Sequence, residues 1–139
     1  MNNRILSARP LHTDLAALSL RLILGGLFVR IGYNKLTAYD EMLAMFGDPI
    51  GIGSELSLIL VIFAEFFCAI LVTIGFLTRL SVIPITITMI VAYFVAHEKD
   101  AFDMKQLPLV FMLLTIVVFI LGAGRYSLDA LIFDRRKGD

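Results

Sequence analysis

The chain has 139 residues, of which 59% are hydrophobic, a formal net charge of zero and a mean hydropathy of +0.89. This composition is too apolar for a soluble domain of this size, and the balanced charge argues against nucleic acid as a partner. Because the apolar runs are continuous rather than alternating, an outer-membrane barrel is excluded as well. We therefore predict an all-α, polytopic membrane protein that forms one domain over residues 1–139.

The first predicted span, residues 15–36, carries three basic side chains, which are Arg21, Arg30 and Lys35. At 100° per residue, Arg21 shares one helix face with Gly25 and Gly32, whereas Arg30 lies on the opposite face. The two glycines allow a neighbouring helix to approach closely, and helix packing alone can explain them. We also expect this face to line the interior of the bundle.

The second predicted span, residues 56–77, contains a single charged residue, Glu65, near its middle. A short turn at residues 75–79 connects it to the third predicted span, residues 80–96. Such a short connection makes the second and third spans an antiparallel hairpin.

The fourth predicted span covers residues 107–121 and follows a polar loop. Two amphipathic segments are expected to lie at the membrane interface, one at residues 39–46 and one within residues 125–139. Together these segments and the four spans form a four-helix transmembrane bundle with a short interfacial C-terminal helix.

Polar side chains and prolines indicate where several helices begin. Thr13 or Asp14 is expected to cap the first span, Ser54 the second, and Ser127 the C-terminal helix. Pro108 fits the first turn of the fourth span, where its missing amide is not needed.

The basic residues of the short loops predict the orientation of the chain. One side carries Arg4, Arg9, Arg79, Arg125, Arg135, Arg136 and Lys137, and the other carries Lys35, Lys99 and Lys105. Because basic loops remain on the cytoplasmic side, both termini are expected to be cytoplasmic. The expected location is the cytoplasmic (inner) membrane of a prokaryote.

Glu65 is the most unusual residue of the predicted spans, because a charge at mid-depth costs about 2.5–3.5 kcal/mol. We expect it to face inward and to be paired. The helical rise places Arg21 closer than Glu65 to the cytoplasmic side and Arg30 closer to the outer side, with similar differences in depth. Since Arg21 shares the glycine face, we predict an Arg21–Glu65 pair, with Arg30 as the competitor. Such a pair either only fixes the helix register or lines a polar ligand cavity.

A second candidate site lies at the predicted outer mouth and comprises Tyr33, Lys35, Tyr93 and His97. Tyr93 and His97 share a helix face because they are four residues apart. Interfacial tyrosines and a solvated histidine are common in membrane proteins. Alternatively, these groups bind the oxygens of a quinone headgroup, with the histidine relaying protons.

Metal and covalent cofactor sites are not expected. Cys68 is the only cysteine, and His12 and His97 are the only histidines and lie far apart in the sequence. There is consequently no C-x-x-C pair, no cysteine metal site and no predicted bis-histidine haem. A redox cofactor would have to be diffusible, such as a quinone, or be held by a partner.

Four stretches together resemble the DoxX family of small membrane proteins, which includes DoxX- and DoxD-like members. They are GRYSLDALI at residues 124–132, Arg21 with the G-x-x-K sequence at 32–35, Glu65, and the G-x-x-T-R turn at 75–79. The matching positions also include Gly32, Gly75, Thr78, Arg79, Gly124, Arg125, Tyr126, Ser127 and Asp129. The resemblance implies a four-helix transmembrane bundle, and family members are often labelled as subunits of quinol oxidase or thiosulfate–quinone oxidoreductase.

The resemblance and the charges within the spans predict a quinone- or quinol-linked, redox-associated subunit that works with a partner enzyme. It would have no independent catalytic motif. The alternatives are a non-enzymatic carrier of small solutes, a membrane accessory or assembly protein, and a purely structural subunit. The expected partners are the lipid bilayer and a quinone or other small hydrophobic ligand. A homo- or hetero-oligomer is also expected, because four short spans bury little surface.

Overall fold

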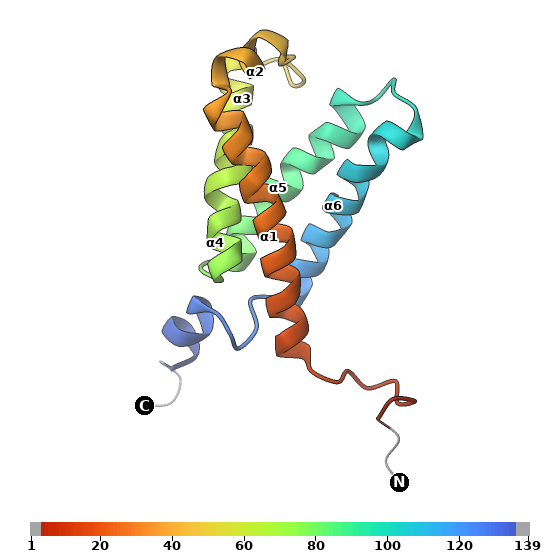
Figure 1. Cartoon of the computed structure of the whole chain (residues 1–139), viewed down its shortest axis with the longest axis vertical. Helices are drawn as coiled ribbons and strands as arrows, with labels where there is room; N and C mark the ends of the chain where they lie inside the picture. The colour runs from red at the N-terminus through yellow and green to blue at the C-terminus, as the bar shows by residue number, and fades with distance from the viewer. Residues whose placement is uncertain (1–3, 136–139) are drawn as a thin grey trace.

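The computed structural model describes residues 4–135, which form helices and loops without a strand in that range (Figure 1). Within it, four helical rods are long and apolar enough to cross a membrane: Thr13–Thr37, Ser54–Ile74, Thr78–Ala96 and Phe102–Leu121. The predicted all-helical, multi-pass architecture is therefore confirmed. Apolar side chains on the outside of these rods are suited to contact with lipid.

The first rod is α1 (Thr13–Thr37), and the connector after it contains the short helix α2 (Tyr39–Met45). The second rod consists of α3 (Ser54–Ile62), the π-helical segment η1 (Phe63–Cys68) and α4 (Ala69–Ile74). This rod ends at Gly75, whose φ of +76° lies in the left-handed region that favours glycine.

The third rod consists of α5 (Thr78–Val91) and η2 (Ala92–Ala96), and the fourth is α6 (Phe102–Leu121). Helix α6 begins five residues before the predicted start at residue 107. Pro108 was expected in the first turn of the fourth span. Because α6 begins earlier, Pro108 lies inside the helix instead. The polar residues before Pro108 were interpreted as loop, but they form the exposed first turns of α6.

Two of the three predicted caps are wrong. The N-cap of α1 is His12, whose Nδ1 accepts a hydrogen bond from the Leu15 amide at 3.1 Å. Ser54 is the first residue of α3, and Gly53 with a φ of +96° precedes it as the N-cap. Ser127 is a cap as predicted, because its hydroxyl accepts a hydrogen bond from the Ala130 amide at 3.2 Å. The C-terminal helical segment that follows ends in η3 (Ala130–Asp134).

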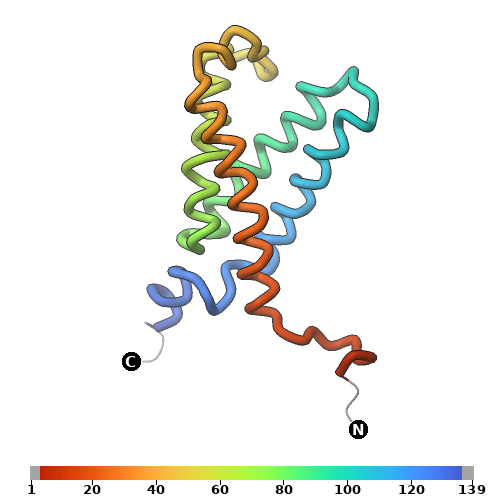
Figure 2. The backbone as a smooth tube through the Cα atoms, viewed as in Figure 1, coloured from red at the N-terminus to blue at the C-terminus, as the bar shows by residue number. Residues whose placement is uncertain are grey.

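The rods pack mainly in two pairs, as the backbone trace in Figure 2 shows. Helix α1 packs along η1 and α4, and α5 packs along α6. The pairs meet where α5 packs on η1 and α4 and where α1 packs on α6. The buried core consists of Leu24, Phe28, Ala64, Cys68, Ala69, Val72, Val82, Ile85, Met89, Phe111 and Val118.

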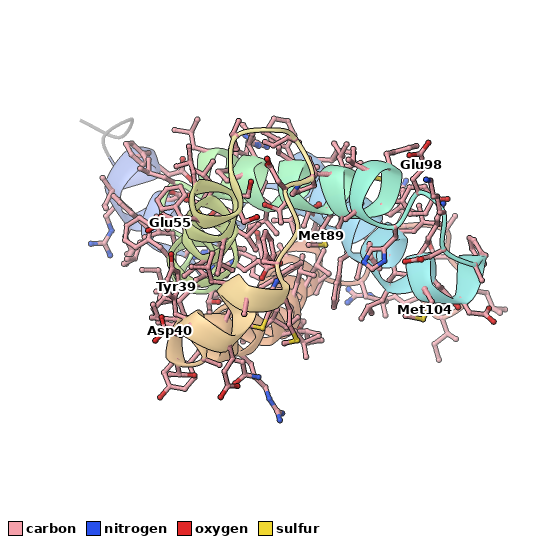
Figure 3. The ribbon with its side chains drawn as sticks, turned by 90° about the horizontal axis from the view of Figure 1, so that it is seen from above. Tyr39, Asp40, Glu55, Met89, Glu98 and Met104 are labelled. Carbon is pink, nitrogen blue, oxygen red and sulfur yellow. The ribbon has the colours of Figure 1, made fainter. Side chains whose placement is uncertain are left out.

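The two pairs separate toward the end of the bundle opposite the termini (Figure 1). Figure 3 looks down on that end, with Tyr39, Asp40 and Glu55 on one side and Glu98 and Met104 on the other. At this end η2 packs against α6 rather than against α1. The loops that the sequence assigned to one outer mouth therefore lie apart.

Candidate functional site

The main polar contact within the spans is an ion pair between Lys35 of α1 and Glu65 of η1. The distance from Lys35 Nζ to Glu65 Oε2 is 2.5 Å. The Glu65 side chain is 2% exposed, whereas that of Lys35 is 20% exposed. The carboxylate is thus enclosed by the bundle, and the ammonium lies at the edge of the enclosed space.

A close approach of two backbones positions this pair. A Cβ atom on Gly32 would lie 2.6 Å from the Glu65 carbonyl carbon and from the Phe66 amide nitrogen, so α1 and η1 touch there. Lys35 follows Gly32 by about one helical turn. In the G-x-x-K sequence, Gly32 therefore allows the close helix contact, and Lys35 reaches the Glu65 carboxylate one turn later.

Side-chain direction brings the two charged groups together. In a helix the Cα–Cβ bonds tilt toward the N-terminus. Because α1 and the second rod run antiparallel (Figure 1), Lys35 and Glu65 tilt toward one another. Glu65 lies in a π-helical segment, a local widening that often occurs at functional sites.

The predicted Arg21–Glu65 pair is wrong. Arg21 is 1% exposed and donates hydrogen bonds to the carbonyl oxygens of Thr73 at 3.1 Å, Val72 at 3.4 Å and Tyr126 at 2.5 Å. Its side chain tilts toward the N-terminus of α1 and so away from Glu65. There it reaches the last carbonyl groups of α4, which have no partner within that helix.

Arg30, the predicted competitor, is exposed and forms no ion pair among residues 4–135. Tyr33 lies near the ion pair, with its ring centroid 6.2 Å from that of Phe66. Tyr33 and Lys35, two of the four residues predicted for the outer site, thus both contact η1.

The other two members of the predicted outer site have different neighbours. The Tyr93 ring lies 5.6 Å from Lys105 Nζ, and His97 Nδ1 is 2.6 Å from Asp100 Oδ2. Tyr93 lies in η2, which packs on α6, and His97 directly follows the end of η2. The separation of the two helix pairs explains why the structure does not gather all four residues at one site.

The remaining motif residues meet at the opposite end of the bundle. Both oxygens of Asp129 accept backbone hydrogen bonds, from Leu77 at 2.7 Å and from Thr78 at 2.9 Å. The Asp129 amide donates to the Gly75 carbonyl at 2.8 Å. Asp129 therefore caps α5 from a distant part of the chain, a role that the sequence analysis missed because no local spacing indicates it.

An arginine and two glycines make further contacts at this end of the bundle. Arg79 Nε donates to the Phe119 carbonyl at 3.0 Å, near the end of α6, and its guanidinium lies against Gly122. Gly124, with a φ of +77°, contacts Ala17 of α1. The turn at residues 75–79 and the GRYSLDALI sequence therefore join all four rods.

Two further contacts attach the C-terminal segment to the start of α1. The Arg125 amide donates to Asp14 Oδ1 at 3.0 Å, and the Tyr126 ring stacks on His12 with centroids 6.3 Å apart. Asp14, expected as a cap, therefore binds another segment instead.

Replacing Asp129 by alanine is expected to lower the free energy of unfolding by about 1–2 kcal/mol, because the Leu77 and Thr78 amides lose their acceptor. Thermal unfolding of the purified protein in detergent measures this loss. Asp134→Ala is the matched control, since Asp134 is exposed on the same segment. Equal effects of the two substitutions would contradict the capping role.

Metal-binding side chains do not gather in the described chain: between residues 4 and 135, no group of three or more His, Cys, Asp or Glu residues could hold a metal ion. Cys68 is buried among apolar side chains of the core. Away from the first turns of the four rods, the charged residues are Arg21, Arg30, Lys35 and Glu65.

The DoxX family model matches residues 16–98, which is more than half of the chain and includes Lys35, Glu65 and the turn at 75–79. The match ends before α6 and the GRYSLDALI sequence, so that part of the resemblance stays a prediction.

One similar protein is an uncharacterized protein of Haemophilus influenzae (strain ATCC 51907 / DSM 11121 / KW20 / Rd), 34% identical over 62 residues. The alignment covers 42% of this chain and 41% of that protein, so it spans less than half of the relative. No solved structure matches the chain. With its four apolar rods and a family match over most of three of them, the chain belongs to the DoxX family.

Proposed function

We propose that this DoxX family membrane protein binds a quinone or quinol beside the Lys35–Glu65 pair and serves as a redox-associated subunit of a partner enzyme. The observation that carries the proposal is the enclosed carboxylate at mid-span, 2% exposed and held by one lysine. Charged residues within membrane spans are costly and usually mark ligand sites or proton pathways.

The pair retains capacity for a ligand. Lys35 carries three N–H donors, of which one is used by Glu65 Oε2. Glu65 Oε1 accepts no hydrogen bond from any side chain or amide of the described residues. A ligand that offers both an acceptor and a hydroxyl donor would form hydrogen bonds with the Lys35 ammonium and with Glu65 Oε1.

A quinone and its quinol have this chemistry. The Lys35 ammonium would donate to a quinone carbonyl, and Glu65 would accept a hydrogen bond and then a proton from a quinol hydroxyl. Tyr33, 54% exposed beside Phe66, offers a further phenol at the edge of the site. The two electrons of the quinol and its second proton would pass to an acceptor held by the partner enzyme.

The same proposal includes a location. The surplus of basic residues at the end that carries the termini supports a cytoplasmic position for both of them. The quinone site then opens toward the outer half of a prokaryotic inner membrane.

Titration of the purified protein with a short-chain ubiquinone or menaquinone analogue tests this function. We expect saturable binding that weakens about tenfold in Glu65→Gln, because one charge-assisted hydrogen bond is lost. Glu55→Gln is the matched control, since Glu55 is an exposed acid on the same rod. Absence of saturable binding, or equal binding by the two variants, would contradict the proposal.

A second candidate is an accessory, assembly or purely structural subunit. It is favoured by the fact that Arg21 and Glu65 both find partners within the chain. In that case Glu65→Gln would lower the melting temperature without altering quinone binding, which the same titration measures.

A further inference from the structure

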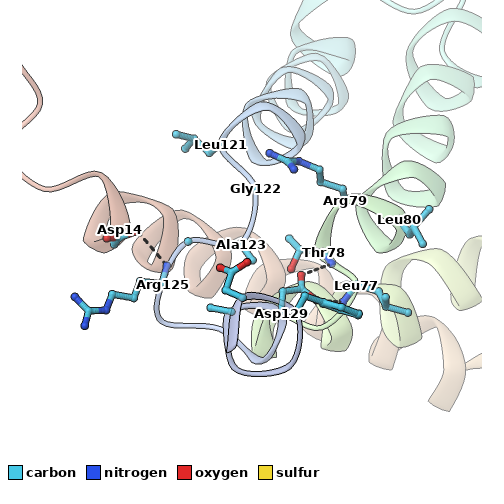
Figure 4. A pocket seen from close by; sticks show the side chains of 14 residues that line it. Asp14, Leu77, Thr78, Arg79, Leu80, Leu121, Gly122, Ala123, Arg125 and Asp129 are labelled. Atoms are coloured by element: carbon cyan, nitrogen blue, oxygen red, sulfur yellow. Dashed lines mark hydrogen bonds between the residues drawn. The ribbon is translucent and has the colours of Figure 1, made fainter. Parts of the chain in front are cut away.

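A pocket of about 550 Å³ lies at the end of the bundle near the termini, between the start of α5, the end of α6 and the C-terminal segment (Figure 4). This volume is within the range of small-molecule sites. It is separate from the Lys35–Glu65 pair, whose residues do not line it.

The pocket is lined by charges of both signs. Two arginines and three aspartates line it, namely Arg79, Arg125, Asp14, Asp129 and Asp134, and the Arg125 side chain extends away from the pocket in Figure 4. This mixture disfavours a simple anion, since the carboxylates outnumber the arginines. A ligand that carries one positive and one negative group fits it better.

Arg79 has donors to spare for the negative group. A guanidinium carries five N–H donors. Two of them bind the Phe119 carbonyl at 3.0 Å and the Ile120 carbonyl at 3.5 Å, which leaves three not used by described residues. Arginine forks of this kind suit phosphate oxygens.

Asp129 and Asp134 provide acceptors for the positive group. Each Asp129 oxygen accepts a single amide, from Leu77 or Thr78, and a carboxylate oxygen has two lone pairs. Asp134 lines the same pocket. An ammonium with several N–H donors could therefore bind to both carboxylates.

A buried hydroxyl also belongs to a residue of the pocket wall. Thr78 is 1% exposed and lines the pocket, and its Oγ1 has no hydrogen-bond partner among the described residues. Because this oxygen has almost no accessible surface, it lies beneath the pocket wall and does not contact a ligand there.

The position of the pocket favours a membrane lipid over a soluble molecule. It lies at the ends of two rods that are long and apolar enough to span a membrane, which is where lipid headgroups are expected. Leu80, 65% exposed, and Phe133, 47% exposed, line the pocket as well. These side chains offer an apolar path for acyl chains next to a polar headgroup site.

We propose that this pocket binds the phosphoethanolamine headgroup of phosphatidylethanolamine. The phosphodiester binds Arg79, and the primary ammonium donates to Asp129 and Asp134. Phosphatidylcholine cannot donate N–H hydrogen bonds, and phosphatidylglycerol has no positive group, so both are expected to bind more weakly.

Native mass spectrometry of the full chain in detergent tests the proposal, with equal amounts of the three dioleoyl lipids present. We expect about tenfold more bound phosphatidylethanolamine than either other lipid, as the loss of a charge-assisted contact implies. Ala123→Leu should abolish this preference by filling the pocket, and Asp134→Asn should reduce it. The matched controls are Ala101→Leu and Asp103→Asn, which lie outside the pocket.

Three results would overturn the proposal. They are equal retention of the three lipids, preferential retention of phosphatidylglycerol, and displacement of the lipid by equimolar soluble O-phosphoethanolamine. The last result would assign the pocket to a free solute instead of a lipid. Melting temperatures without lipid show whether each variant is folded, and Asp134→Asn, on an exposed side chain, gives the test if Ala123→Leu does not fold.

Discussion

Lys35→Leu is expected to lower the free energy of unfolding by about 3–5 kcal/mol, because it leaves the Glu65 carboxylate enclosed without a partner. Reversible unfolding in mixed detergent measures this loss. Lys99→Leu is the matched control, since Lys99 is exposed in a loop and forms no ion pair with the described residues.

The two members of the pair are not equivalent. Glu65→Leu should cost less, about 1–2 kcal/mol, because the partly exposed Lys35 ammonium can then extend to the interface. The double variant should be more stable than Lys35→Leu alone, since no unpaired charge is left inside. A double variant less stable than Lys35→Leu would contradict an ion pair between these residues.

Gly32→Ala is expected to destabilise the protein by about 1–3 kcal/mol, because the added Cβ would lie 2.6 Å from backbone atoms of Glu65 and Phe66. Those atoms belong to a helix, so the two rods themselves must move apart. The displacement would also lengthen the Lys35–Glu65 contact and weaken ligand binding there. Unfolding and quinone titration of the same variant measure both effects.

Gly26→Ala is the matched control for this substitution. Gly26 is in the same helix, and a Cβ there has no atom within 4 Å. The control should be neutral or stabilising by about 0.5–1 kcal/mol, because alanine is the better helix former. Equal destabilisation by both substitutions would show that helix propensity, and not the contact with η1, determines the effect.

The fold could be predicted largely from the sequence. Apolar runs give the four rods, because about 20 residues are needed to cross a bilayer whatever their neighbours are. The helix ends were less predictable. Residues 102–106 include three polar side chains and resemble a loop, yet they form the start of α6.

The partner of Glu65 could not be predicted correctly from depth alone. Helical rise gives the depth of each Cα atom in the membrane. The length of an arginine or lysine side chain is comparable to the differences in depth between these residues. The tilt of the Cβ atoms in antiparallel helices decides between Arg21 and Lys35. That tilt could have been used, because four spans with both termini on one side already make the first and second spans antiparallel.

The capping role of Asp129 could not be predicted from sequence patterns. Its carboxylate binds amides that lie about fifty residues earlier in the chain. Only the packing of the C-terminal segment beneath the turn at residues 75–79 creates this contact. The His12 cap was missed for a different and local reason, because α1 begins at Thr13, two residues before the predicted start at residue 15.

The central claim is that Glu65 is held by Lys35 and that Arg21 serves the opposite end of the bundle. Two double-mutant cycles in one unfolding assay test it most directly, Lys35→Leu with Glu65→Leu and Arg21→Leu with Glu65→Leu. We expect coupling of about 1–3 kcal/mol in the first cycle and additivity within about 0.5 kcal/mol in the second. Stronger coupling of Glu65 to Arg21 than to Lys35 would contradict the account.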